Sequence, residues 1–160
     1  MIFKKYCYFV LVSCLFLAVT ACSRKAAELE NPLPVNHDNK FYFINYWAEW
    51  CKPCREEIPE LNHFLKANAP QVEVFGVNFD GALGADLLRQ EAQLGVEFPT
   101  LVADPASFLG LSRPTGLPVT VVLDRNGTVT HQLEGEQTQQ TLEQILASLL
   151  AAEDAEALPE

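Results

Sequence analysis

Runs of apolar residues divide this chain into segments with the period of either a strand or a helix. The run at 40–47, "KFYFINYW", is almost continuously aromatic or β-branched, which is typical of a strand buried on both faces. Between 54 and 68 the apolar residues Ile58, Leu61 and Leu65 return at helical spacing. This pattern predicts a strand and then a helix that begins at the cysteine pair of "CKPC".

The remainder of the chain continues this alternation in short segments. We predict further strands at 72–79, 100–104, 119–124 and 128–135, further helices at 82–94 and 138–152, and a helical turn around Phe108. The last two strands should form an antiparallel hairpin across the turn "RNG". The buried side of the last helix is expected to carry the apolar residues Leu142, Ile145, Leu146, Leu149 and Leu150.

This order of elements predicts one α/β domain at 40–152, built on a mixed central sheet with helices on both faces. A chain of 160 residues has room for one such core. The polar stretch 22–39 is interpreted as a tether, because it contains prolines and no apolar period. The acidic end at 153–160 is expected to be disordered.

Residues 1–21 have the pattern of an export signal, in which two lysines precede an apolar run from Tyr6 to Ala21. As a helix this run would be about 24 Å long, shorter than a hydrocarbon core of about 30 Å. An uncleaved membrane anchor is the alternative. The end of the run, "VTAC", resembles the lipobox of bacterial lipoproteins. That resemblance implies lipidation of Cys22 and a periplasm-facing protein. Because Ser23 follows, it also implies sorting to the outer membrane, with the inner membrane as the alternative.

The charge balance argues against partners that carry a high negative charge. Asp and Glu number 21 against 11 Lys and Arg, a net charge of −10, and loss of the signal would remove Lys4 and Lys5 as well. No basic stripe appears along the chain. Nucleic acid and anionic membrane surfaces are therefore not expected as partners, and membrane attachment would depend on the lipid at Cys22.

Three kinds of chemistry are open to the pair Cys51 and Cys54. A zinc site needs two more ligands, but His37, His63 and His131 stand singly, so no metal is expected. A purely structural disulfide would close a very short loop and contribute little stability. A redox dithiol fits best, because the first cysteine lies at the positive end of a helix and the second within one turn.

We therefore predict that Cys51 is the nucleophile and Cys54 the resolving thiol, with no cofactor required. Between them, Pro53 stiffens the turn, and the charge of Lys52 favours the thiolate.

The segment "YWAEWCKPC" resembles the active-site segment of thioredoxins, and "LPVTVVLDRNGTV" resembles their cis-proline strand and hairpin. The resemblance spans roughly 40–150 and implies a thioredoxin-like fold. It also implies a catalytic role for Pro118, whose cis bond would expose the backbone of Leu117 beside Cys51. With Leu117, the residues Trp50, Lys52 and Pro53 are expected to contact the substrate.

Further details resemble the TlpA/ResA-type branch of that superfamily. Asn45 stands where cytoplasmic thioredoxins have a buried aspartate, and "CKPCREEIPEL" and "GLPVT" match motifs of the branch. The segment "EFPTLVADPASFLGLSRPTG" resembles its strand-helix insertion. Because little chain lies between Cys22 and the first core strand, the usual N-terminal hairpin of this branch is expected to be reduced or absent.

A proton acceptor for Cys54 is left open. Asn45 does not titrate, so the candidates by position are the carboxylates Glu49, Glu56, Glu57 and Asp80. Each is expected to be an exposed carboxylate, and no base is assigned.

The resulting prediction is an exported, lipid-anchored thiol-disulfide oxidoreductase that reduces disulfides of periplasmic client proteins and is re-reduced by a membrane thiol donor. The alternatives are a disulfide-forming oxidase and a non-catalytic thioredoxin-like interaction module. A peroxidase of the peroxiredoxin type is disfavoured, because its Pro and Thr-x-x-Cys pattern is absent before Cys51.

Overall fold

The computed structural model describes Leu33 and residues 39–156. The predicted signal at 1–21, the lipidation site Cys22 and most of the predicted tether lie outside the described residues. Within the described part of the chain, no helix is both long and apolar enough to cross a membrane.

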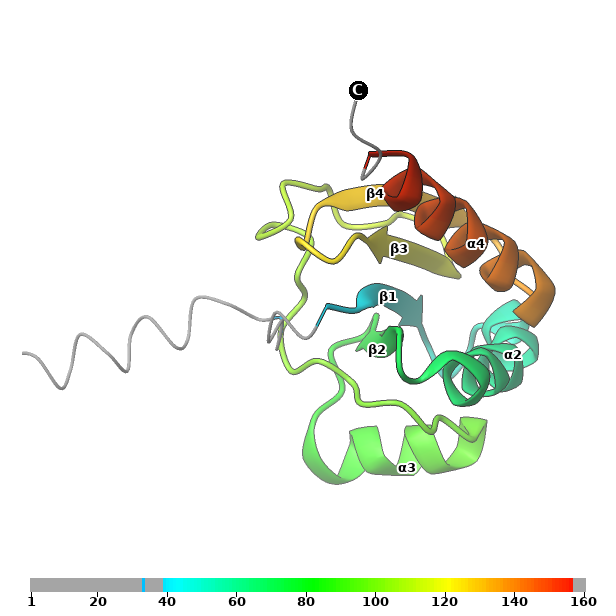
Figure 1. The fold of residues 1–160 in the computed structure, drawn as a ribbon. Helices are drawn as coiled ribbons and strands as arrows, with labels where there is room; N and C mark the ends of the chain where they lie inside the picture. Colours follow the sequence, from blue (N-terminus) through cyan, green and yellow to red (C-terminus); the bar gives the residue numbers. More distant parts are fainter. Residues whose placement is uncertain (1–32, 34–38, 157–160) are drawn as a thin grey trace, which may run out of the picture. The chain divides into compact units, whose positions relative to one another are not determined.

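Four strands form one mixed sheet in the order β2-β1-β3-β4 (Figure 1). The strands are β1 Phe41–Trp47, β2 Val72–Asn78, β3 Val119–Leu123 and β4 Val129–Glu134. β1 pairs in parallel with β2 and antiparallel with β3, and β3 pairs antiparallel with β4. All seven residues of β1 are buried, as expected for a strand covered on both faces.

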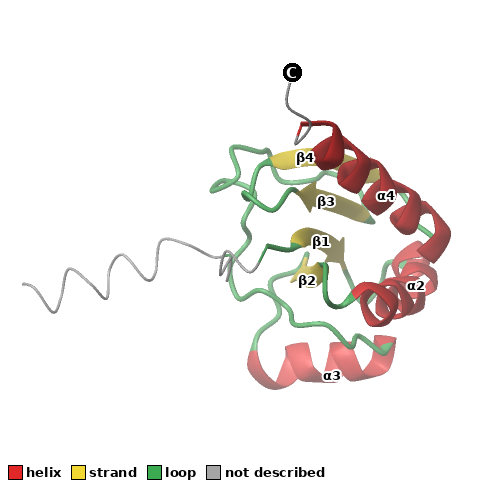
Figure 2. Cartoon of the chain, in the orientation of Figure 1, coloured by secondary structure: helices red, strands yellow, loops and turns green. Residues whose placement is uncertain are grey.

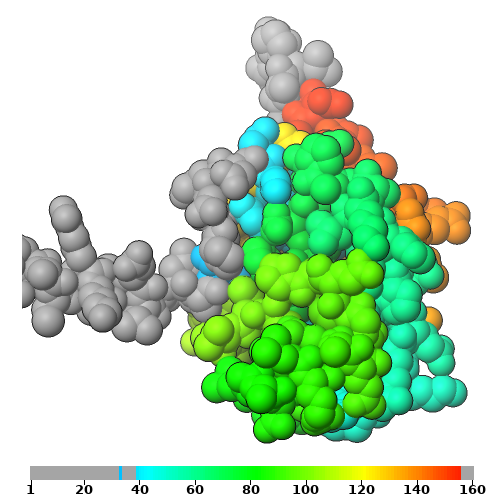
Figure 3. Space-filling model, turned by 90° about the horizontal axis from the view of Figure 1, so that it is seen from below, coloured from blue at the N-terminus to red at the C-terminus, as the bar shows by residue number. Residues whose placement is uncertain are grey.

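Three helices flank the sheet (Figure 2). They are α2 Lys52–Asn68, α3 Gly84–Leu94 and α4 Gln139–Glu156. α2 and α4 lie side by side and share the main apolar core, to which Ile58 and Leu61 contribute from α2 and Leu142 and Leu146 from α4. α3 and the residues after it occupy much of the surface seen in Figure 3. The predicted α/β fold with a mixed sheet and flanking helices is thus confirmed.

The predicted strand at 100–104 is wrong. Only Thr100 forms a bridge, in parallel with Gly76, where the Gly76 N–H donates to Pro99 and the Leu101 N–H donates to Gly76, both at 2.8 Å. Beyond this point Val102 is 82% exposed and the chain bends away, so the pairing ends. The predicted helical turn around Phe108 is present as a turn at 106–110.

The predicted disorder of 153–160 is wrong for its first half, because α4 continues to Glu156. The sequence "AAEDAE" is rich in alanine and glutamate, which favour helix and allow α4 to pass its predicted end at 152. Residues 157–160 lie outside the described part of the chain.

Candidate redox site

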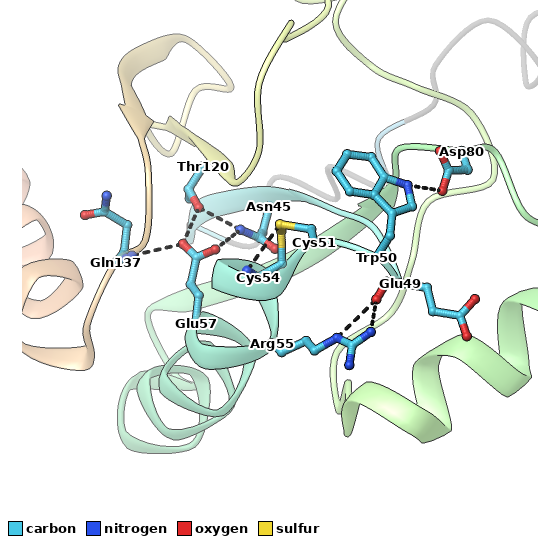
Figure 4. The surroundings of a disulfide bond; sticks show 10 residues. All are labelled: Asn45, Glu49, Trp50, Cys51, Cys54, Arg55, Glu57, Asp80, Thr120 and Gln137. Atoms are coloured by element: carbon cyan, nitrogen blue, oxygen red, sulfur yellow. Dashed lines mark hydrogen bonds between the residues drawn. A yellow bond between two sulfur atoms is a disulfide. The ribbon is translucent and has the colours of Figure 1, made fainter.

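Cys51 and Cys54 form a disulfide at the first turn of α2, with an S–S distance of 2.02 Å (Figure 4). Cys51 is the N-cap residue of the helix, and the backbone N–H of Cys54 donates to its Sγ at 3.3 Å. Pro53 fits the first turn of α2, because the backbone N–H groups of a helix's first turn have no partner within the helix and proline lacks this group. Both cysteines are buried, and a Cys51 thiolate would lie at the positive end of α2.

On the inner side of the disulfide lies a buried carboxyl group, that of Glu57, which is 0% exposed. Asn45 Nδ2 donates to Glu57 Oε2 at 2.9 Å, and the Thr120 hydroxyl and the backbone N–H of Gln137 donate to Oε1 at 3.4 and 3.3 Å (Figure 4). Asn45 Nδ2 also donates to Thr120 Oγ1 at 3.0 Å. Glu57 follows Cys54 by three residues, so both side chains lie on the same face of α2.

Burial raises the pKa of Glu57 to about 7, although Asn45, Gln137 and Thr120 all donate to its carboxylate and favour the charged form. Glu136 adds a smaller rise in this pKa through charge repulsion. A carboxyl group with this pKa can both accept and release a proton near neutral pH.

The sequence-based expectation that Glu57 is an exposed carboxylate is therefore wrong. A signal was present, because Glu57 falls on the helical stripe of Cys54, Ile58 and Leu61, whereas Glu56 is exposed. The remaining candidates, Glu49 and Asp80, have other partners, described below.

On the outer side of the disulfide, Trp50 Nε1 donates to Asp80 Oδ2 at 2.9 Å. The carbonyl oxygen of Glu49 accepts from Arg55 Nε at 3.1 Å and from Nη2 at 2.5 Å (Figure 4). The Glu49 carboxylate pairs with Arg89 of α3 at 2.7 Å, which lowers the pKa of Glu49. The loop before Cys51 is thus tied to both α2 and α3.

The peptide bond between Leu117 and Pro118 is cis, which confirms the expected geometry. Two residues later Thr120 pairs with Asn45 in the register of β3 and β1. The fold therefore brings the cysteine motif "CKPCREEIPEL" and the proline motif "GLPVT" together, since Thr120 of the second donates to Glu57 of the first. Leu117 is partly buried against the core that contains Cys51.

The side chain of Lys52 has no contact with the buried group around Glu57, because it is 87% exposed and pairs with Glu56 at 4.0 Å. Trp47 is buried in the core. Across residue 33 and residues 39–156, no three His, Cys, Asp or Glu side chains gather as a metal-ligand set.

The sequence and the fold of this chain are similar to those of known proteins. Residues 25–138 match the AhpC/TSA family. The chain is 31% identical over 113 residues to thiol-disulfide oxidoreductase ResA of Bacillus anthracis, covering 69% of this chain and 64% of ResA. It is 33% identical over 119 residues to the thiol:disulfide interchange protein HelX of Rhodobacter capsulatus, covering 71% and 63%. The match thus spans less than two thirds of each of these two relatives.

Among solved structures, a putative thiol:disulfide interchange protein DsbE from Chlorobium tepidum has a TM-score of 0.57 at 33% identity, covering 71% of this chain and 83% of that one. A DsbF homologue from Corynebacterium diphtheriae has a TM-score of 0.60 at 24% identity, over 71% and 74% of the two chains, which shows the shared fold.

Proposed function

The chain belongs to the AhpC/TSA family of thioredoxin-like proteins, and we propose that it is a thiol-disulfide oxidoreductase that reduces disulfides of client proteins. The observation that carries the proposal is the Cys51–Cys54 disulfide at the start of α2, with the buried carboxyl group of Glu57 one helical turn away. The names of the relatives, oxidoreductase and interchange protein, support the same reaction class.

In the proposed cycle the Cys51 thiolate attacks one sulfur of a client disulfide, and the other client sulfur leaves as a thiolate and takes up a proton. Cys54 then attacks Cys51 Sγ, the bond from Cys51 to the client breaks, and the client leaves as a dithiol. The client gains two electrons, and this protein keeps the Cys51–Cys54 disulfide seen here. A thiol donor, proposed to be membrane-bound, must return two electrons and two protons.

Glu57 is proposed as the group that takes the proton from Cys54 before the second attack. Its position three residues after Cys54 puts it on the right face of α2. Its pKa of about 7 lets it accept that proton at neutral pH and release it afterwards.

The cellular setting is also a proposal. We place residues 1–21 as an export signal and Cys22 as the lipid-bearing residue that holds the protein on the periplasmic side of the outer membrane, with periplasmic proteins as clients. The support is the basic start, the short apolar run and "VTAC". Replacing Cys22→Ala should abolish acylation and membrane retention; retention of the variant would contradict the anchor.

Insulin reduction by the pre-reduced protein tests the reaction. Cys51→Ser should abolish turnover, and Cys54→Ser should accumulate a mixed disulfide between Cys51 and the client. Equal activity of Cys51→Ser and the parent would contradict the proposed reaction and favour the alternative of a non-catalytic interaction module. The direction of electron flow is tested by equilibration with glutathione. A reduction potential of about −270 mV supports a reductase, and one of about −120 mV would make the protein an oxidase.

A further inference from the structure

Trp50, next to Cys51, is 63% exposed and yet has fixed partners on two sides. Its indole N–H donates to the Asp80 carboxylate at 2.9 Å, as Figure 4 shows. Its ring meets the ring of Phe79 edge-on, with centroids 6.4 Å apart and an interplanar angle of 87°. A side chain this exposed has few packing contacts, so these two contacts decide where the ring lies.

Phe79 is itself held by the segment that follows α3. The guanidinium of Arg113 lies 4.2 Å from the centroid of the Phe79 ring and donates to the Phe79 carbonyl oxygen. Arg113 also pairs with Asp104 at 3.0 Å, and Asp104 accepts from the hydroxyl of the buried Tyr46 at 2.7 Å. A continuous set of contacts therefore runs from β1 to the exposed indole.

The backbone beneath Trp50 is fixed as well, because Arg55 holds the carbonyl of Glu49 and Arg89 holds its carboxylate. An aromatic surface that is already rigid loses little conformational entropy when a partner binds to it. Trp is also among the residues that most often dominate binding surfaces. A rigid indole beside the redox cysteine is thus suited to contact a client chain.

We infer that Asp80 is a positioning residue: by accepting the indole N–H, it holds Trp50 as the surface on which the client segment next to the scissile disulfide lies. This inference rests on the proposed function. It gives Asp80 a different task from proton transfer with Cys54, which is proposed above for Glu57. Asp80 thereby acts on client binding and leaves the thiol chemistry unaffected.

The test compares Asp80→Ala with the parent on insulin and on a small dialkyl disulfide. The loss of one hydrogen bond corresponds to a change in affinity of about three- to tenfold. We therefore expect KM for insulin to rise by this factor in Asp80→Ala. The rate with the small disulfide and kcat for insulin should stay within about twofold. Asp80→Asn keeps an acceptor oxygen and should restore most of the affinity. Asp154→Ala, on the last turn of α4, removes an equal charge and should leave KM unchanged.

Trp50→Phe keeps an aromatic ring but removes the N–H donor, so Asp80→Ala should have no further effect in that background. An equal effect in both backgrounds, or a loss of rate with the small disulfide, would overturn the inference.

The decay of tryptophan fluorescence anisotropy provides a readout without turnover. Asp80→Ala should add a fast component from motion of Trp50, whereas the contribution of the buried Trp47 should stay the same. Unchanged decay would overturn the inference, whereas an inactive parent with the expected decay would overturn only the proposed function.

Discussion

The inner and outer sides of the Cys51–Cys54 disulfide both carry hydrogen-bonded carboxylates, but in different surroundings. On the inner side Glu57 is buried with Asn45 and Thr120. On the outer side the exposed Asp80 and the partly exposed Glu49 bind Trp50 and Arg89. Burial raises the pKa of Glu57, whereas an arginine lowers that of Glu49. The inner carboxyl group is thereby suited to proton transfer, and the outer carboxylates hold other groups in place.

The energetic consequences differ in the same way. A buried polar group that loses its partner costs about 1–3 kcal/mol, because water cannot replace the bond. Exposed ion pairs contribute little, and salt screens them. Changes on the inner side should therefore alter rate and stability strongly, and changes on the outer side should alter client contact and little else.

The largest effect is expected for Glu57→Gln, which keeps the shape of the side chain but removes its titration. If Glu57 takes the proton from Cys54, the resolution of the mixed disulfide should slow by about 100-fold or more near neutral pH. Its pH dependence near pH 7 should disappear. Glu56→Gln is the matched control, since Glu56 precedes Glu57 on the same helix and is exposed. Stopped-flow measurement of client release checks this, and equal slowing in both variants would contradict it.

Glu57 should also make the stability of the oxidised protein depend on pH. Its folded pKa is raised to about 7 from the ordinary 4.5, so the folded state holds a proton that the unfolded state has lost. The contribution is complete below about pH 4.5 and disappears as the pH rises through about 7, a total of about 3 kcal/mol. Urea unfolding across this range should show this fall as the difference between the parent and Glu57→Gln. A difference that does not vary with pH would contradict the raised pKa.

A smaller effect is expected from Thr120→Val, which removes the hydroxyl that donates to Glu57 and accepts from Asn45. The variant should lose about 1–3 kcal/mol of unfolding free energy in urea. The pKa of Glu57 should rise further, because the Thr120 hydrogen bond favours the charged form. Thr130→Val, on the exposed side of β4, is the control, and an equal loss in both variants would argue against the buried cluster.

The sequence predicted most of the sheet and the helices, because the runs that form β1 and α2 carry their own apolar periods. It failed where structure depends on a distant partner. The segment at 100–104 has strand-forming residues, but Gly76 bonds it only around Thr100. Likewise, the cysteine pair and Pro118 are visible as motifs, whereas the hydrogen bond between Thr120 and Glu57 joins residues 63 positions apart in the chain.

The smallest effect is expected from Arg89→Ala, which removes the partner of the Glu49 carboxylate at the outer surface. The pKa of Glu49 should rise toward its ordinary value, because the Arg89 hydrogen bond is the main cause of its lowering. The urea midpoint should move less than in Thr120→Val, since solvent can replace an exposed ion pair. Insulin reduction at low salt should weaken slightly and match the parent at high salt, because salt screens the pair in the parent as well. A loss of activity that does not depend on salt, or a shift of the urea midpoint as large as that of Thr120→Val, would contradict this expectation. Either result would show that the outer side is energetically coupled to the core, so that the two sides of the disulfide do not differ in this respect.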